Sequence, residues 1–379
     1  MHIAFLTPEY PHPDVKHSAG IGTSIKNIAT GLMAAGHRVT VFVYSQKHTK
    51  VVDSDGVNLH LIAHKTYRFG GWLRYRKLVN TYLNTIITRS DISVIEAPDW
   101  TGITAFMRFK IPLVIRLHGS DTYFCDLEGR PQKKKNYFFE KMALKGATAI
   151  AAVSAFTGQR TLSLFGLSAS FTVLPNPIDT AKFQPGSQAV IAGRILNFGS
   201  VIRKKGVLAL AKAFNDIAAT SDHPHLIFLG NDVTDIQTGT STRSLILASI
   251  ETRFHDRVQF IDAVPYDEVI SHIQKAAVVY LPSYAEAFPM TWLEAMAMEK
   301  GLITSDIGWA KELMVDRETG LMVNPNQYKA LAAALEYLLE NPEQAKVMGQ
   351  TARQHLLAHF AMETLIARNI AFYKEVLKA

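Results

Sequence analysis

The sequence predicts an α/β protein built from two doubly wound domains, each with a parallel sheet covered by helices on both faces. Short apolar runs rich in β-branched residues alternate with segments of helical periodicity along most of the chain. The alternation of apolar runs and helical segments begins again after the proline-containing segment 174–188, which we interpret as a linker. The length of 379 residues also exceeds that of one ordinary core. We predict a first domain over 1–186 and a second over 187–361.

In the first domain the βαβ rhythm begins with the apolar run IAFLT and continues with helical periodicity at 24–35 and 73–88. The predicted strands lie at 3–7, 38–44, 92–97, 112–118, 147–154 and 171–175. The acidic triplet DSD at 53–55 resembles the metal-binding DxD of another enzyme fold. It directly precedes Gly56 between two strands, however, so a hairpin turn is the favoured interpretation.

In the second domain the predicted strands lie at 194–200, 225–230, 257–263, 277–282 and 301–305. Two doubly wound domains in tandem are expected to form a cleft at the carboxyl ends of their strands, where open α/β sheets bind ligands. The last helical segment, 362–379, is expected to pack back on the first domain.

Composition narrows the class of protein. No run of 18 residues is both uncharged and continuously apolar, which argues against a membrane span. The lone Cys125 excludes an intrachain disulfide and a thiolate metal site, and the N-terminal run is unlike a secretory signal. The histidines form no HExxH pattern, so no metal is expected. We therefore expect a cytoplasmic protein.

Charge is distributed unevenly along the chain. Residues 1–186 contain 22 Lys and Arg against 12 Asp and Glu, a net +10, while residues 187–379 contain 18 against 21, a net −3. Residues 56–90 contain six basic residues and no acid, and Tyr67, Phe69, Trp72 and Tyr75 are interleaved with the basic residues. Three interpretations remain open: a solvated basic face, a surface for anionic lipid or a lipid-linked phosphate, and, without any supporting motif, a nucleic-acid surface.

Three segments can bind a phosphate or a sugar. The first is HSAGIGTSIKNIATGL, where Gly20, Ile21 and Gly22 precede a predicted helix. Glycines let backbone N–H groups approach a phosphate, and a helix N-terminus favours an anion. A tight turn without any ligand explains the same pattern equally simply.

The second segment is GSVIRKKG, which follows the first strand of the second domain. It places Arg203, Lys204 and Lys205 on a turn that faces the predicted cleft, where the three cations can hold a diphosphate. The alternative is a solvated charge run.

The third segment, SYAEAFPMTWLEAMAMEKG, contains two carboxylates in apolar surroundings. Pro289 suits the first turn of a helix, so we predict a helix from Phe288 or Pro289 to about Lys300. Glu286 then lies in the preceding loop and Glu294 on the second turn. Carboxylates beside a helix N-terminus fit a nucleotide sugar, because the amides face a diphosphate and the carboxylates accept hydrogen bonds from hydroxyls. The alternative is a helix cap and a surface residue.

These segments together resemble glycosyltransferase family 4, the retaining GT-B enzymes of glycosyl transferases group 1. EAFPMTWLEAMA is similar to the family's E-x7-E motif, VLPNPIDTAKFQP to its interdomain N-P-[IV]-D-x-x-x-F, and GSVIRKKG to its phosphate loop. AGIGTSIKNIATGL and ETGLMVNP also resemble family segments. The resemblance extends in order from residue 1 to about residue 325.

The resemblance implies transfer of a hexose from a nucleoside diphosphate sugar, with retention and without a metal or other cofactor. It implies that Glu286 binds sugar hydroxyls, that Glu294 binds ribose, and that Lys205 with Arg203 or Lys204 neutralises the leaving diphosphate. His118, in RLHGSD, would contact the transferred sugar. The remaining donor contacts would come from residues Gly20, Ile21, Gly22, Phe288, Met290 and Thr291.

Two departures from the family pattern affect the donor site. Ser200 stands where arginine is frequent, and Pro289 removes one amide that usually faces the sugar, for which the Thr291 hydroxyl can substitute. We expect an acceptor that is a glycan or a lipid-linked glycan for surface polysaccharide, bound by the first domain at an anionic membrane. The predicted acceptor contacts are Glu9, Arg74, Asp99 and Trp100. The alternatives are a sugar-nucleotide epimerase or hydrolase, and a nucleotide-sugar-binding protein without turnover.

Overall fold

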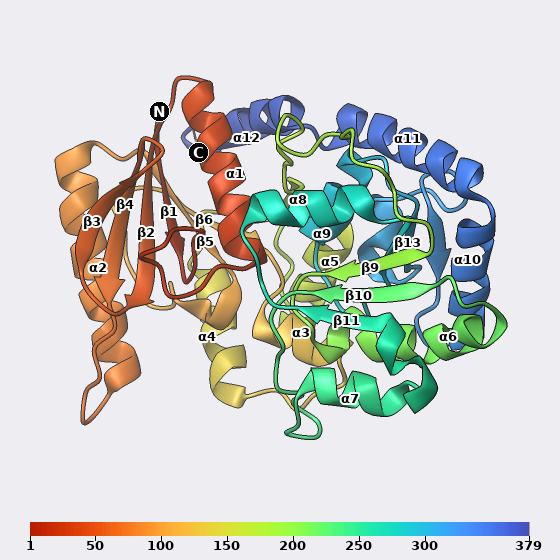
Figure 1. Cartoon of the computed structure of the whole chain (residues 1–379). Coiled ribbons are helices and arrows are strands. Elements are labelled where there is room, and N and C mark those ends of the chain that lie inside the picture. The colour runs from red at the N-terminus through yellow and green to blue at the C-terminus, as the bar shows by residue number, and fades with distance from the viewer. Residues whose placement is uncertain (379) are drawn as a thin grey trace. The chain divides into compact units, whose positions relative to one another are not determined.

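The computed structural model describes residues 1–378 and divides into two compact units (Figure 1). Unit 1 contains Met1–Pro177 and the C-terminal segment from Ala361, and unit 2 is Ile178–Phe360. Residues 178–186, which the sequence analysis assigned to the first domain, thus lie in unit 2. The backbone N–H of Ile178 donates to the carbonyl of Phe360, and the ring of Phe183 packs on that of Tyr266 with 5.7 Å between centroids.

Unit 1 contains a sheet of eight strands in the order β3-β4-β2-β1-β5-β6-β7-β8. All neighbouring pairs in this sheet are parallel except β3 and β4, which form an antiparallel hairpin at its edge. The strands are β1 (His2–Thr7), β2 (Arg38–Gln46), β3 (Lys50–Ser54), β4 (Val57–Ala63), β5 (Val94–Pro98), β6 (Leu113–Leu117), β7 (Ala149–Ala152) and β8 (Thr172–Val173).

Both faces of this sheet are covered, as the strand residues alternate between two cores. Ile3 and Phe5 of β1 are buried in one core with residues of α1 and α12, and Ala4 and Leu6 are buried in another with residues of α2 and α5. The helices of unit 1 are α1 (Gly20–Ala34), α2 (Gly71–Ser90), α3 (Asp121–Leu127), α4 (Lys134–Lys145), α5 (Ala155–Phe165) and α12 (Met362–Val376), with the 3₁₀ helix η1 (Trp100–Gly102).

Helix α12 packs closely on α1 (Figure 1). A Cβ atom at Gly31 of α1 would lie 2.4 Å from Cγ1 of Ile366, so glycine permits this approach. A buried network fixes the same helix to the sheet. The guanidinium of Arg116 donates to both oxygens of Glu96 at 2.7 and 3.0 Å and to Oδ1 of Asn369 at 2.6 Å. The hydroxyl of Tyr373 donates to Oε2 of Glu96 at 2.8 Å.

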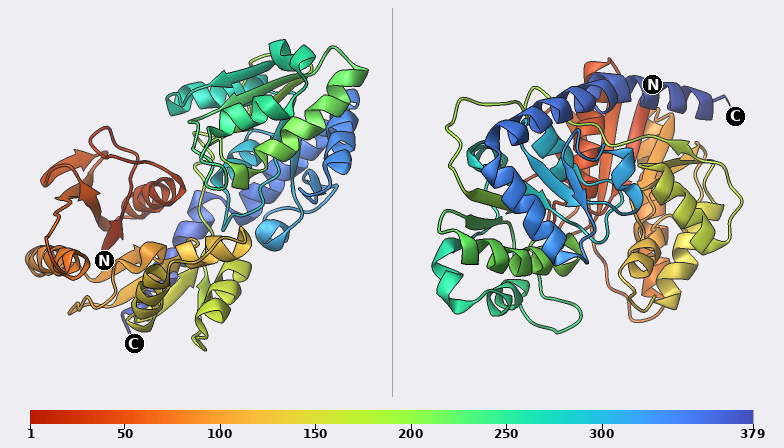
Figure 2. Two further views of the ribbon diagram at one scale, coloured as in Figure 1. Left: turned by 90° about the horizontal axis from the view of Figure 1, so that it is seen from below. Right: turned by 90° about the vertical axis from the view of Figure 1, so that its right-hand side faces the viewer.

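Unit 2 contains a second, fully parallel sheet in the order β11-β10-β9-β12-β13-β14, with helices on both sides (Figure 2). Its strands are β9 (Arg194–Phe198), β10 (His225–Leu229), β11 (Val258–Ile261), β12 (Val278–Leu281), β13 (Leu302–Ser305) and β14 (Leu321–Val323). Its helices are α6 (Val207–Thr220), α7 (Thr242–Ser249), α8 (Tyr266–Lys275), α9 (Met290–Ala297), α10 (Tyr328–Glu340) and α11 (Pro342–His359), with the 3₁₀ helices η2 (Arg203–Lys205), η3 (Thr252–Arg257) and η4 (Gly308–Glu312).

The predicted fold class is confirmed, and every predicted strand is present; β1 and β2 are longer than predicted and the others are shorter. The DSD segment forms the predicted hairpin turn, in which the N–H of Gly56 donates to Oδ1 of Asp53 at 3.1 Å. Strand β14 lies in the ETGLMVNP segment and was not predicted as a strand. Helix α9 ends at Ala297 rather than near Lys300, because Glu299 adopts a left-handed conformation with φ of 56°.

Candidate functional site

The predicted donor residues of unit 2 meet where β9 ends. At Gly199 the chain turns with φ of 106°, and a Cβ atom there would lie 2.7 Å from Nζ of Lys205 and 3.5 Å from Cγ2 of Thr291. The positive φ favours glycine at this position, and the backbone here passes beneath these two side chains. Nζ of Lys205 is also 3.9 Å from Oε1 of Glu286, which accepts a 3.4 Å hydrogen bond from Ser283. The structure thus brings Lys205, Glu286 and Thr291 together.

The second predicted carboxylate, Glu294, is buried on α9 beside Tyr266. The Tyr266 hydroxyl donates a 2.7 Å hydrogen bond to Oε1 of Glu294. Burial raises the pKa of Glu294, while the Tyr266 hydrogen bond and the charges of Lys205 and Lys182 oppose that rise. Lys182 lies over the Tyr266 ring with 4.9 Å from Nζ to the centroid. Tyr266 was not predicted from the sequence, because its hydrogen bond to Glu294 joins residues 28 positions apart.

Arg203 is paired with a residue that the sequence analysis missed. Its guanidinium donates to both oxygens of Asp235, at 2.7 and 2.9 Å, and Thr238 donates to the same carboxylate through its N–H and its hydroxyl. These hydrogen bonds lower the pKa of Asp235 to about 2. Asp235 is buried, so Arg203 neutralises it and is a weaker candidate for a catalytic cation than Lys205. The backbone carbonyl of Lys204 accepts from the N–H of Tyr284 at 2.7 Å.

The start of α9 contains the other predicted donor contacts. Pro289 is the N-cap residue, so the helix begins at Met290. The side chains of Phe288 and Met290 are buried, and the Phe288 ring packs on Phe360 with 5.6 Å between centroids. These two residues therefore have backbone groups, rather than side chains, available for a ligand at this helix terminus.

In unit 1, His118 and Asp99 lie at the carboxyl ends of β6 and β5. The backbone N–H of His118 donates to Oδ1 of Asp99 at 3.0 Å. Burial, with the charge of Arg116, lowers the pKa of His118 to about 3, so its imidazole is neutral at physiological pH. Burial raises the pKa of Asp99 to about 8, and Oδ2 of this carboxyl has no hydrogen-bond partner among residues 1–378.

In unit 1, the carboxylate of Glu9 accepts a hydrogen bond from the predicted phosphate loop. The N–H of Gly22, in the first turn of α1, donates to Oε1 of Glu9 at 2.8 Å. A Cβ atom at Gly22 would lie 3.0 Å from the Glu9 backbone, whereas Gly20 faces open space. Burial raises the pKa of Glu9, and the backbone hydrogen bonds from Gly22, Ile21 and Ala19 oppose that rise. Backbone N–H groups of the predicted phosphate loop thus donate to Glu9.

The predicted acceptor residues do not form one group. Trp100 begins η1, directly after Asp99. Arg74 instead lines a separate groove of about 740 Å³ along α2, together with Lys65, Lys77 and Arg89. Neither Glu9 nor Asp99 lines this groove, so Arg74 belongs to a different surface of unit 1.

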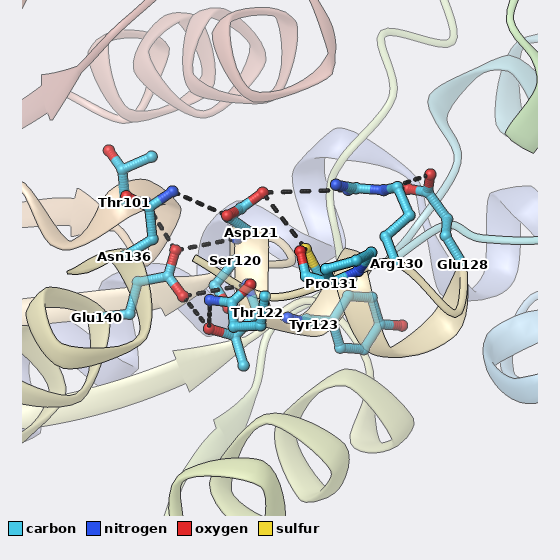
Figure 3. Close-up of polar contacts among 12 residues, drawn as sticks. Thr101, Ser120, Asp121, Thr122, Tyr123, Glu128, Arg130, Pro131, Asn136 and Glu140 are labelled. Atoms are coloured by element: carbon cyan, nitrogen blue, oxygen red, sulfur yellow. Dashed lines mark hydrogen bonds and ion pairs between the residues drawn. The ribbon is translucent and has the colours of Figure 1, made fainter. Parts of the chain in front are cut away.

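Glu140 of α4 is a buried carboxylate that the sequence analysis did not select. It accepts hydrogen bonds from the N–H groups of Thr101, Asp121 and Thr122, at 3.0 to 3.1 Å, and from the hydroxyl of Thr122 (Figure 3). It therefore fixes the loop after β5 to the start of α3, and its charge contributes to the raised pKa of Asp99. The available sequence signal was a single acidic residue, next to Phe138 and Phe139, in a segment rich in lysine.

Two features of residues 1–378 concern metal binding and membrane spans. No group of three or more His, Cys, Asp or Glu side chains is arranged there to hold a metal ion. In the same residues no helix is long and apolar enough to span a membrane.

The fold and the residues around Lys205 define a two-domain glycosyltransferase of GT-B type, and comparisons with known proteins agree. The model for glycosyl transferases group 1 matches residues 191–355, and the model for glycosyltransferase family 4 matches residues 18–182. Together these matches cover most of both units. The chain belongs to the glycosyltransferases of family 4.

The sequences of individual relatives align with most of this chain. Glycogen synthase of Mycobacterium tuberculosis is 24% identical, over 98% of this chain and 94% of its own length. A GDP-mannose-dependent alpha-(1-6)-phosphatidylinositol monomannoside mannosyltransferase of the same species is 24% identical, over 78% and 79%. Sucrose-phosphate synthase of Thermosynechococcus elongatus superimposes with a TM-score of 0.82 at 20% identity, over 100% of this chain and 99% of that one.

Proposed function

We propose that the protein transfers a hexose from a nucleoside diphosphate sugar to a glycan or lipid-linked glycan, with retention of the anomeric configuration and without a metal. The observation that carries this proposal is the position of Lys205 above Gly199, next to Glu286 and Thr291. It combines a cation, a carboxylate and a helix N-terminus in unit 2. These groups suit the diphosphate and the hydroxyls of one donor molecule.

The chemical difficulty of the reaction is the negative charge that develops on the leaving diphosphate. Lys205 supplies a fixed cation, and the N-terminus of α9 supplies aligned amides, so both stabilise this charge. Transfer breaks the bond from the anomeric carbon to the phosphate oxygen and forms a bond from that carbon to the acceptor hydroxyl oxygen. The acceptor proton passes to the phosphate oxygen on the same face, which requires no carboxylate nucleophile and leads to retention.

The carboxylates have separate roles in this proposal. Glu286 accepts hydrogen bonds from hydroxyls of the hexose, and Glu294, held by Tyr266, accepts them from the ribose. The hydroxyl of Thr291 takes the place of the amide that Pro289 lacks. In unit 1, the neutral imidazole of His118 can donate a hydrogen bond to a sugar hydroxyl or accept one from it.

We further propose that the product is a bacterial-type surface polysaccharide and that the enzyme works in the cytoplasm at an anionic membrane. Two observations support this. A relative is named for its phosphatidylinositol-linked acceptor, and the groove along α2 has four basic and no acidic residues in its lining. Phosphate-bearing lipid acceptors fit such a groove by charge.

A panel of nucleoside diphosphate sugars tests the reaction, with released nucleoside diphosphate measured in the presence and absence of acceptor. Release that requires acceptor supports transfer. Release without acceptor would indicate a hydrolase, conversion of the sugar nucleotide an epimerase, and binding without any release a protein that lacks turnover. NMR of the new glycosidic bond tests retention, and activity in EDTA tests metal independence.

Two substitutions test the site. Glu286→Ala and Lys205→Ala are each expected to lower turnover by roughly tenfold or more, about 1.4 kcal/mol of barrier. Lys329→Ala, at an exposed position of unit 2, is the matched control and should leave turnover unchanged. Wild-type rates in both site variants would refute the assignment.

A further inference from the structure

We propose that an exposed aromatic surface of unit 1 inserts into the interface of an anionic phospholipid bilayer, and that the rings of Trp72, Phe106 and Phe138 enter it. This aromatic surface consists of those three side chains, which come from the start of α2, the loop after η1 and α4. The inference deepens the proposed membrane location by naming the element that contacts lipid. It does not require that the enzyme transfers a sugar.

The three rings form one cluster around the buried ring of Phe139. The centroid of Phe139 lies 5.0 Å from that of Trp72, 6.2 Å from that of Phe106 and 5.6 Å from that of Phe138. Phe106 and Phe138 also contact each other, at 5.9 Å. The outer three side chains nevertheless remain 42 to 53% exposed. A contiguous apolar patch on a soluble surface marks an interaction site.

The backbone conformation of Phe106 indicates that its ring has a function other than packing in the core. Its φ is 65°, in the left-handed region that a bulky residue rarely adopts. That conformation leaves the ring 53% exposed, so burial of the ring does not offset the strain. Strained residues that present an apolar side chain to solvent are typical of binding surfaces.

The exposed charged residues in the chain segments that carry Phe106 and Phe138 are basic. Residues 100–120 contain no acid, and residues 129–148 contain only Glu140, which is buried beneath four hydrogen-bond donors. Lys133, Lys134 and Lys135 are exposed at the start of α4. Arg76 lies 4.1 Å from the centroid of Phe139. Anionic headgroups are the partner that this charge pattern attracts.

Helix α2 adds further basic charge to unit 1, in the separate groove described above. It contains no acidic residue, and its groove has the cations Lys65, Arg74, Lys77 and Arg89 over a floor that includes Ile62, Leu78 and Ile86. Just before the helix, Phe69 is 70% exposed with the guanidinium of Arg68 at 5.4 Å from its centroid. Aromatic residues at the level of the headgroups, flanked by Lys and Arg, are characteristic of interfacial membrane binding.

Vesicle flotation without any sugar nucleotide tests the proposal. The wild-type protein should bind phosphatidylcholine vesicles that contain phosphatidylglycerol, should bind pure phosphatidylcholine vesicles weakly, and should be partly released at high salt. The double variant Phe106→Asn/Phe138→Gln should bind the anionic vesicles roughly tenfold or more weakly. Asparagine tolerates the left-handed backbone at residue 106, and glutamine is a good helix former at 138.

The matched control is Ile236→Asn, which removes a 67% exposed apolar side chain from unit 2 and should leave vesicle binding unchanged. Thermal unfolding confirms that each variant folds. Wild-type affinity in the double variant, an equal loss in the control, or equal binding to neutral vesicles would overturn the proposal. So would an oligonucleotide that binds as tightly as the anionic vesicles and loses affinity in the same variant.

Insertion has a separate spectroscopic signature. In a Trp100→Phe background, which removes the half-buried tryptophan of η1, brominated lipids should quench the fluorescence of Trp72, whereas Trp292 and Trp309 are buried and inaccessible to lipid. Trp72→Phe should remove the quenchable component and keep vesicle binding. Equal quenching in this background with and without Trp72→Phe would show that the bilayer does not contact this surface.

Discussion

The hydroxyl of Tyr266 lies 2.7 Å from Oε1 of Glu294 and fixes the orientation of that buried carboxylate. The Tyr266 ring is held in turn by Lys182, 4.9 Å from its centroid, and by Phe183, edge-on at 5.7 Å. Lys182 and Phe183 belong to the PNPIDTAKF segment. This segment therefore has a structural purpose within unit 2, because it positions the side chain that orients Glu294.

We predict that Tyr266→Phe weakens binding of the nucleoside diphosphate by roughly tenfold, the usual effect of losing one hydrogen bond to a charged group. Burial already raises the pKa of Glu294, and Tyr266 opposes that rise. The variant should therefore lose affinity at a higher pH than the wild type as pH falls. Calorimetric titration across pH measures this shift. Tyr337→Phe, at an exposed position, is the control, and an unshifted acid limb would contradict the role of Tyr266.

We expect substitution of Arg203 to lower stability and substitution of Lys205 to lower turnover. Arg203→Ala leaves the buried carboxylate of Asp235 without its cation and should lower the free energy of unfolding by about 1 to 3 kcal/mol. Lys205→Ala should leave stability near the wild-type value and lower turnover instead. Urea unfolding beside steady-state kinetics separates the two effects. A stable but inactive Arg203→Ala variant would place Arg203 in the catalytic group after all.

The buried network of unit 1 predicts a large effect on stability. Glu96→Gln removes the charge that compensates the fully buried Arg116 and should destabilise the protein by about 3 to 5 kcal/mol. The partly exposed bidentate pair of Arg160 and Asp126 is the comparison. Asp126→Asn should change stability by less than about 1 kcal/mol. Similar losses in both variants, measured by denaturant unfolding, would show that burial does not govern these pairs.

Asp99 should make stability depend on pH. Its pKa is about 8 in the folded protein, against about 3.9 when unfolded. Between about pH 3.9 and 8, Asp99 is protonated in the folded protein and ionised in the unfolded chain. Folding therefore takes up a proton in this range, so the free energy of unfolding is highest at low pH and falls as pH rises toward 8. Thermal unfolding from pH 5 to 8 should show a decline that is steeper in the wild type than in Asp99→Asn. Parallel curves would mean that Asp99 is ionised throughout.

Local sequence patterns were sufficient for the fold and for several predicted site residues. The alternation of β-branched runs and helical segments predicted the strands, and a proline and two glutamates predicted the start of α9 with Glu286 and Glu294 on either side. Those signals lie within one or two turns of chain, where propensity and spacing act directly.

The partners of these residues were not predictable in the same way. Asp235 lies 32 residues from Arg203, Tyr266 lies 28 residues from Glu294, and Glu140 lies 39 residues from Thr101. Such pairs are set by how helices and loops meet in three dimensions, which no local pattern encodes. The same reason explains why the hydrogen bond from the N–H of Gly22 to Glu9 was not predicted.

The packing of α12 on α1 has a consequence for synthesis of the chain. Unit 1 consists of residues 1–177 and a helix that a ribosome makes only after all 183 residues of unit 2, Ile178–Phe360. Until then, Glu96 and Arg116 lack Asn369 and Tyr373, and the core residues of α1 lack their apolar contacts with α12. The first domain to be translated is thus the last to be completed, and the nascent chain carries an open hydrophobic face throughout that interval.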